Sequence, residues 1–298
     1  MAKDKKDKKE KKKEKKGKKG KAGKKQKPIP PKHVLYEASV QGVDADLDFI
    51  TGVYRRRRNK LPRLIREDFC GTALLACEWV RRNGNNRAWG VDLHQPTLDW
   101  GIEHHVSKLS ESAQRRLTLI NDNVLTVKTP RVDILMAQNY SYWVFKERRA
   151  MLDYFRRAHE ALKPDGAFCL DLFGGTESMV EVAEETKIEG CRGADGTKVP
   201  DFTYVWDQAK FNPVTNEILC YIHFELPGKR QVRRAFTYDW RLWTVAELRD
   251  LLEEAGFASS DVYTEGWDEK EEEGDGVFRK RTKFENQEMW LAYIVAWR

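Results

Sequence analysis

The segment from Leu64 to Ala76 places the strongest constraint on the fold, because it reads as a short strand, a tight loop and the start of a helix. The strand ends on the carboxylate of Glu67, and Gly71 has no Cβ to keep a ligand away from the loop backbone. The following helix directs its first N–H groups and its positive dipole end toward the same place. Asp92 ends a second strand and is placed to hold ribose hydroxyls. This spacing predicts a βαβ unit with a nucleoside site at its carboxyl edge.

Strands and helices continue to alternate on both sides of this unit. A helical pattern that breaks at Gly42 precedes it, and a capping box of Thr244 and Glu247 opens a late helix that ends at Gly256. The remaining helices are expected at 73–82, 96–109 and 146–162. The strands of this alternation are expected at 63–67, 87–91, 117–121, 132–137, 167–173, 261–265 and 289–297.

The alternation stops between Gly174 and Tyr238. Three segments there alternate apolar and polar residues, at 203–211, 218–226 and 232–240, with Asn212-Pro213 and Pro227-Gly228 as turns between them. Such a pattern predicts an inserted antiparallel sheet of three strands. A later acidic stretch, Asp268–Gly276, is expected to be a mobile loop, and the last strand is expected to follow the sixth by a hairpin.

The dinucleotide fingerprint G-x-G-x-x-G is absent, so a nicotinamide enzyme is disfavoured. The segment instead resembles motif I of the class I S-adenosylmethionine-dependent methyltransferases, acid-x-Gly-x-Gly-x-Gly. Glu67 takes the acid position and Gly71 the middle glycine, while Phe69 and Ala73 stand where the outer glycines would be. The turn at 162–166, Leu-Lys-Pro-Asp-Gly, also resembles a sequence common in that family. The resemblance covers residues 35–298.

The resemblance implies an α/β fold, with a doubly wound, mostly parallel sheet of seven strands whose last strand is antiparallel. It implies a helical cap segment at 28–62, a core at 63–175 and 241–298, and an insert at 176–240 over the acceptor site. It also implies S-adenosyl-L-methionine as the cofactor. The residues expected to bind it are Glu67, Phe69, Cys70, Gly71, Thr72, Asp92, Leu93, Asp122, Asn123, Val124, Gln138, Asn139, Tyr36 and Gln41. Simple packing is the alternative for Tyr36 and Gln41, and a plain turn for Asp122 and Asn123.

Two residues are candidates for catalysis. Tyr140 follows the fourth strand, where the family places residues beside the transferable methyl group, and His223 lies in the middle of an insert strand. Asn139-Tyr140-Ser141 is similar to the small-molecule branch, because the Pro-Pro-aromatic run of base-methylating enzymes is missing. The leading hypothesis is methyl transfer to N or O of a small molecule. The alternatives are an RNA- or ribosome-associated methyltransferase and a non-catalytic binding module. Most of the insert aromatics are expected to be buried against the main sheet, and the alternatives for them are the acceptor cavity or a contact with a second copy.

Residues 1–27 contain sixteen lysines and four acidic residues, whereas the rest of the chain has a net charge of −5. From Ala2 to Lys27 this tail has no aliphatic side chain larger than alanine and no aromatic. It is expected to be disordered, either as a solubilising arm or as a non-specific contact to nucleic acid or another polyanion. The five cysteines form no C-x-x-C pair, which favours reduced thiols in a cytoplasmic protein. No metal site is indicated, and no apolar run is long enough for a membrane span.

Overall fold

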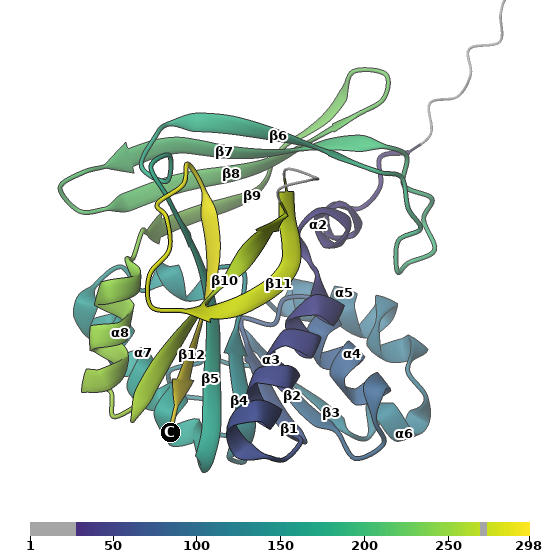
Figure 1. Ribbon diagram of the computed structural model, residues 1–298. Coiled ribbons are helices and arrows are strands. Elements are labelled where there is room, and N and C mark those ends of the chain that lie inside the picture. The colour runs from purple at the N-terminus through teal and green to yellow at the C-terminus, as the bar shows by residue number, and fades with distance from the viewer. Residues whose placement is uncertain (1–27, 269–272) are drawn as a thin grey trace, which may run out of the picture.

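The computed structural model describes residues 28–268 and 273–298 of the chain. The Lys-rich segment 1–27 and its predicted disorder lie outside the described residues. In the described part, a large sheet forms the body of the molecule and a smaller sheet lies across its top (Figure 1). No helix of the described part is long and apolar enough to cross a bilayer.

The large sheet has eight strands, in the order β11-β10-β12-β5-β4-β1-β2-β3. The pairs formed among the first five strands of the chain are parallel, and those formed by the last three are antiparallel. The strand bounds are β1 (Leu64–Asp68), β2 (Arg87–Asp92), β3 (Leu117–Asn121), β4 (Val132–Ala137), β5 (Leu162–Gly174), β10 (Ser259–Asp268), β11 (Glu273–Arg281) and β12 (Trp290–Trp297).

The prediction of seven strands was wrong by one, because β11 also joins this sheet. Residues 273–276 of the expected mobile loop belong to β11, which pairs with β10, while 269–272 lie outside the described residues. Phe278 anchors β11 by packing against Phe49 and Tyr293, with ring centroids 5.6 and 4.7 Å away. The last strand therefore follows an added hairpin rather than the sixth strand directly. This strand left little sign in the sequence, because its side chains follow an acidic run and are mostly exposed.

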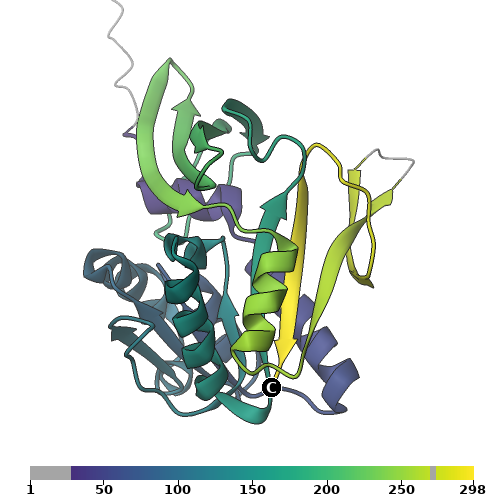
Figure 2. The same ribbon diagram turned by 90° about the vertical axis from the view of Figure 1, so that its left-hand side faces the viewer.

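Helices cover both faces of the large sheet (Figure 2). Alternate residues of β4 show why: Leu135 packs into one core cluster, whereas its neighbours Ile134 and Met136 pack into the other. In Figure 2 the teal and green helices lie on one side of β5 and β12, and the purple α3 lies on the other. The first side carries α7 (Arg148–Ala161) and α8 (Val245–Glu254), and the second carries α3 (Val43–Arg58), α4 (Leu74–Arg82), α5 (Gln95–His104), η1 (Val106–Lys108) and α6 (Glu111–Gln114).

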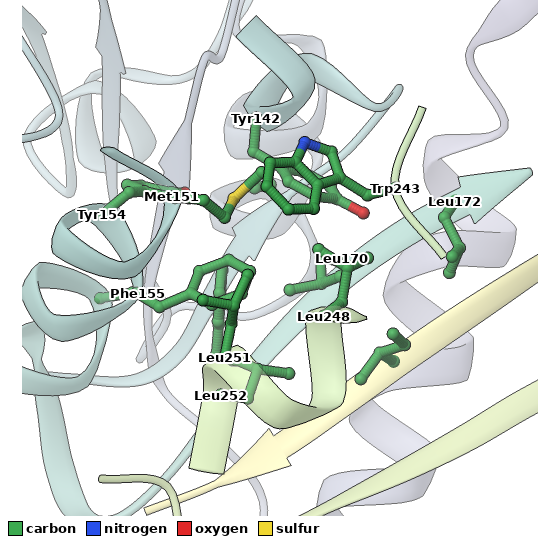
Figure 3. Close-up of a cluster of buried hydrophobic side chains, with 14 of the residues drawn as sticks. Tyr142, Met151, Tyr154, Phe155, Leu170, Leu172, Trp243, Leu248, Leu251 and Leu252 are labelled. Atoms are coloured by element: carbon green, nitrogen blue, oxygen red, sulfur yellow. The ribbon is translucent and has the colours of Figure 1, made fainter. Parts of the chain in front are cut away.

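Figure 3 shows the core beneath α7 and α8. Met151 and Phe155 are four residues apart on α7 and so lie on one helical face, which meets Leu251 of α8 and Leu170 of β5. Burying a side chain of this size stabilises the fold by about 1.5–3 kcal/mol. The predicted capping box at the start of α8 is confirmed, because the Thr244 hydroxyl accepts a hydrogen bond from the backbone N–H of Glu247.

The small sheet has four strands rather than the predicted three. The missed strand is at its edge, and its pattern is weak because most of its side chains are exposed. A smaller difference concerns residues 164–166, which form the bulged start of β5 rather than a separate turn. The bounds of the small sheet are β6 (Val182–Ile188), β7 (Phe202–Asn212), β8 (Glu217–Leu226) and β9 (Arg230–Arg241).

Two more helices position the site. The pattern that breaks at Gly42 gives α2 (Lys32–Val40) before α3, as the sequence predicts, and α2 lies beneath the small sheet in Figure 1. A short helix, η2 (Ser141–Val144), follows β4. The five cysteines are free, in agreement with the prediction of reduced thiols.

Candidate active site

The loop between β1 and α4 explains the departure from the glycine pattern. Phe69, Gly71 and Ala73 all have left-handed backbone angles, with φ values of 57°, 53° and 58°. Glycine adopts this conformation at little cost, whereas other residues are strained in it. The loop therefore keeps a backbone shape that favours glycine at all three positions, although only one glycine remains. Backbone strain of this kind concentrates at functional sites.

Asp92 fastens this loop to the end of β2. Its Oδ2 atom accepts a hydrogen bond of 2.8 Å from the backbone N–H of Gly71, and its Oδ1 atom accepts one of 2.8 Å from the N–H of His94. The N–H of Cys70 adds a bond of 3.0 Å to the carbonyl of Val91. A carboxylate oxygen has room for a second donor, so Asp92 both shapes the loop and keeps acceptor capacity for a ligand.

Glu67 is an almost completely buried acid, 6% exposed, at the end of β1. Its Oε2 atom accepts a hydrogen bond of 3.1 Å from the backbone N–H of Ala76. Burial raises the pKa of Glu67 to about 8; the bond from Ala76 opposes this shift, and the nearby carboxylate of Asp92 adds to it. The site therefore favours a positively charged group beside Glu67.

These residues line a cavity of about 480 Å³, termed here the first chamber. It brings together most of the residues that the sequence singled out for cofactor binding: Tyr36, Gln41, Glu67, Phe69, Cys70, Gly71, Thr72, Asp92, Gln138 and Asn139.

Four predicted cofactor residues lie outside this lining. Leu93 is 67% exposed, and Val124 is buried, with its carbonyl accepting a hydrogen bond from Arg66. The Asp122 side chain accepts from its neighbouring backbone N–H, and Asn123 accepts from the N–H of Leu125. The two polar side chains thus make a local turn, which was the alternative prediction for them.

A buried polar cluster holds α2 over the first chamber. The Glu37 carboxylate accepts a bond of 2.7 Å from the Thr72 hydroxyl and lies 2.7 Å from the Nε2 atom of His105. Lys32, at the start of α2, lies over the ring of Phe236 from β9, with 4.8 Å between its nitrogen and the ring centroid. These contacts tie α2 to both the motif loop and the small sheet.

The helix α5 packs closely behind the same loop at Gly101. A Cβ atom at this position would lie 2.2 Å from the backbone oxygen of Thr72. We expect Gly101→Ala to destabilise the protein by about 1–3 kcal/mol, because the clash outweighs the better helix propensity of alanine. Urea denaturation would measure this. Gly84→Ala is the matched control, since nothing lies within 4 Å of its Cβ position. Equal stabilities of the two variants would contradict the close packing.

A second strained loop follows β4. Asn139 and Tyr140 have φ values of 56° and 57°. Asp171 of β5 holds both residues, because its carboxylate accepts bonds of 2.8 and 3.0 Å from their backbone N–H groups. Asp171 is 7% exposed, and burial raises its pKa to about 7, an effect that these two bonds oppose. Its place at the end of a central strand fixes the direction in which the loop presents its side chains.

This loop separates the first chamber from a second cavity of about 460 Å³, termed the second chamber. Tyr140, a predicted catalytic residue, lines the second chamber, and four residues line both: Tyr36, Asn139, Tyr238 and Trp240. The small sheet supplies much of the wall, because the residues facing it alternate along β7, β8 and β9. These wall residues are Tyr204, Trp206, Ile222, Tyr238 and Trp240.

His223, the other predicted catalytic residue, lines neither chamber. Its neighbours Ile222 and Phe224 are buried beneath the small sheet, so its own side chain lies on the opposite face. There its Nε2 atom lies 3.1 Å from Asp207, and its Nδ1 atom accepts from the backbone N–H of Arg234. The structure therefore does not bring His223 to the site.

Sequence reasoning missed all four acids of the second chamber, Asp46, Asp171, Glu184 and Glu265. Asp171 had a signal: it is the only charged residue in the otherwise apolar stretch 167–173. Asp46 had none, because one acid among several on a helix reads as a solvated residue. Its carboxylate accepts a hydrogen bond from the hydroxyl of Tyr293 on β12, far away in the sequence.

Comparison with solved structures bears on the fold. The chain is similar to an S-adenosylmethionine-dependent methyltransferase from Clostridium acetobutylicum, with a TM-score of 0.60, 16% identity, and coverage of 88% of this chain and 96% of that one. It is similar to an amino pentose methyltransferase of calicheamicin biosynthesis from Micromonospora echinaspora. The TM-score is 0.62 and the identity 12%, with coverage of 92% of this chain and 98% of that one. It is also similar to a sugar N-methyltransferase from a Streptoalloteichus species, with a TM-score of 0.59, 14% identity, and coverage of 89% of this chain and 92% of that one.

This chain has the fold of the class I S-adenosylmethionine-dependent methyltransferases. The likeness extends over nearly the whole length of those proteins, and the mostly parallel sheet with antiparallel final strands agrees with the resemblance stated from the sequence. No family model and no curated protein sequence matches the chain.

Proposed function

We propose that this protein is an S-adenosylmethionine-dependent methyltransferase that acts on N or O of a small molecule. One observation carries the proposal: two chambers meet at Tyr36, Asn139, Tyr238 and Trp240. The first has nucleoside-type residues at the carboxyl ends of β1 and β2, and the second is lined in part by aromatic side chains. Two adjoining chambers suit the transfer of a group between two small molecules.

The first chamber fits the proposed cofactor in three respects. The space beside Gly71 is open, since a Cβ there would meet only Thr97, at 3.9 Å. The buried Oε1 atom of Gln41 has no hydrogen-bond partner among the described residues. Glu67 is a buried acid whose described interactions include no ion pair. A nucleoside with an attached ammonium and sulfonium would supply the missing donor and the positive charge.

S-adenosylmethionine supplies an activated methyl group when it is bound. The protein's part is to orient and to exclude water. Asp92 is placed to hold ribose hydroxyls, and Glu67 is placed to balance the positive charge of the methionine end. The strained loop of Asn139 and Tyr140 lies between the chambers and directs the acceptor toward the first. The insert at 176–240 is proposed to select the acceptor, and the cap at 28–62 to cover the cofactor.

Two of the similar solved structures are methyltransferases that act on small molecules, which supports this proposal. One is described as binding S-adenosylmethionine and acting on an amino pentose, and another as a sugar N-methyltransferase. At 12% and 14% identity they support the fold, and the residues of the chambers support the chemistry.

The test is a titration with S-adenosylmethionine, followed by transfer of a labelled methyl group to a metabolite extract or to total RNA. We expect saturable cofactor binding and label in the small-molecule fraction. Label in RNA alone would favour the alternative in which the Lys-rich tail anchors the enzyme to RNA or ribosomes. Absence of cofactor binding would favour a non-catalytic module.

Tyr140→Phe tests the boundary between the chambers. We expect turnover of an identified acceptor to fall about 3- to 10-fold, because one hydroxyl facing the second chamber is removed. Cofactor affinity should stay within about twofold. Steady-state kinetics with a parallel cofactor titration would measure both. Tyr221→Phe is the control, since Tyr221 lies outside both chambers. Loss of cofactor binding with unchanged turnover would show that the chambers are assigned the wrong way round.

A further inference from the structure

The second chamber carries negative charge without a positive partner. Among the described residues that line it, four are carboxylates and none is Lys, Arg or His. No three His, Cys, Asp or Glu side chains of the described part are grouped so that they could hold a metal ion. The acidic groups are therefore spread over different walls, formed by α3, β5, β6 and β10. They are Asp46, Asp171, Glu184 and Glu265.

Several aromatic rings line the chamber where it meets the small sheet. Tyr238 and Trp240 are stacked, with 4.3 Å between ring centroids, and Trp206 lies 6.0 and 6.3 Å from them. The edge-on rings of Tyr140 and Phe173 complete this group, 4.9 Å apart. The faces of such rings attract cations, and tryptophan does so most strongly.

The carboxylates keep free hydrogen-bonding capacity. The side chain of Glu184 makes no hydrogen bond or ion pair with any described residue. Asp46 accepts from the hydroxyl of Tyr293 through one oxygen, which leaves its other oxygen open. Asp171 takes one backbone N–H on each oxygen and retains a lone pair on each. A carboxylate that is withdrawn from water without a cation is costly, so a positively charged ligand would offset that cost.

We propose that the second chamber binds an organic amine in its ammonium form, and that the nitrogen of this amine is the methyl acceptor. This inference rests on the proposed function and narrows its acceptor from N or O to a cationic nitrogen. A hydroxyl acceptor needs at most one base and would leave the other carboxylates without compensation.

The ammonium first gives a proton to a chamber carboxylate, which passes it to solvent. The freed lone pair of the nitrogen forms the new N–C bond, while the C–S bond of the cofactor breaks and its electron pair stays on sulfur. The products are S-adenosylhomocysteine and an N-methylated ammonium, which the same carboxylates can hold.

Two molecules of equal shape test the charge preference. Choline and its uncharged isostere 3,3-dimethylbutan-1-ol would be titrated into the full chain by calorimetry. We expect choline to bind at least about tenfold more tightly, since both rings and carboxylates favour the cation. Equal affinities, or no saturable binding of choline, would overturn the inference.

Glu184→Gln should lower this preference at least about threefold, because it removes one chamber charge and keeps the side-chain shape. Glu185→Gln is the matched control: it makes the same change in net charge one residue along β6, where the side chain is exposed and lies outside the lining. Asp46→Asn is a second chamber variant, which keeps an oxygen for Tyr293. An unchanged preference in both chamber variants would overturn the assignment of these carboxylates.

A parallel titration with S-adenosylmethionine separates this inference from the proposed function. A choline preference without cofactor binding would reject the methyltransferase and keep the cation site. Cofactor binding without a choline preference would reject the cation site alone. If both hold, a metabolite extract is divided on a cation exchanger before incubation with labelled cofactor. Label is expected in the retained, cationic fraction, and label confined to the unretained fraction would overturn the inference.

Discussion

Replacing Asp92 with alanine is expected to weaken S-adenosylmethionine binding about 10- to 150-fold, or about 1.5–3 kcal/mol, the usual cost of losing a charged hydrogen-bond partner. Two effects act together. The proposed ribose acceptor is lost, and the backbone N–H groups of Gly71 and His94 lose the carboxylate that positions them. The loop then has to be ordered by the ligand itself, which costs part of the binding energy.

Calorimetry of the wild type and the variant would measure this effect. Asp99→Ala is a suitable control, because Asp99 is an exposed acid on α5 that lines neither chamber. Its affinity should equal that of the wild type. An unchanged affinity in the Asp92 variant would remove Asp92 from the cofactor site.

Asp68→Ala is expected to destabilise the fold by about 3–5 kcal/mol. Asp68 and Arg66 form a buried ion pair with 2.6 Å between Oδ1 and Nε, and their side chains are 0% and 3% exposed. The hydroxyl of Tyr154 donates to the other carboxylate oxygen over 3.0 Å. Removing Asp68 leaves the guanidinium of Arg66 in the core with a bond of 3.3 Å to the carbonyl of Val124 as its remaining hydrogen bond.

Thermal and urea denaturation would both detect a change of this size. The double variant Arg66→Met, Asp68→Leu is the informative control, because it removes both charges and should recover much of the lost stability. Tyr154→Phe should cost less, about 1.5–3 kcal/mol, because the buried carboxylate loses one hydrogen bond and keeps its ion pair. An Asp68→Ala variant as stable as the wild type would show that Arg66 reaches water when its partner is removed.

The order of the main elements was predictable because strands, helices and caps each have a recognisable pattern in a short stretch of sequence. The break at Gly42, the capping box of Thr244 and the strand at 132–137 depend on neighbouring residues, and the structure confirms them. The strands β6 and β11 were missed since they are stabilised mainly by pairing with β7 and β10, and their own side chains show a weak pattern. Pairing partners distant in the sequence leave little local trace.

The candidate site also has a part that was predictable from local sequence and a part that depends on tertiary packing. The motif loop was predictable from Glu67 and Gly71, and the left-handed backbone at Phe69 and Ala73 explains how it persists without the outer glycines. The second chamber was less predictable, because Asp46 reaches it only through the packing of α3 beside β12. The placement of His223 depends on which face of an insert strand meets the body, and that depends on tertiary packing.

The helix α2 couples the binding of the two proposed ligands. Its residue Tyr36 lines both chambers, and Glu37 anchors the helix to the motif loop through Thr72. Two ligands that each stabilise the same position of one helix are thermodynamically linked, and each raises the affinity of the other by the same factor. A bound acceptor would then slow the loss of unreacted cofactor, and an altered acceptor would change the apparent affinity for cofactor. Under the proposed function, acceptor selectivity and cofactor retention would both depend on this helix of nine residues.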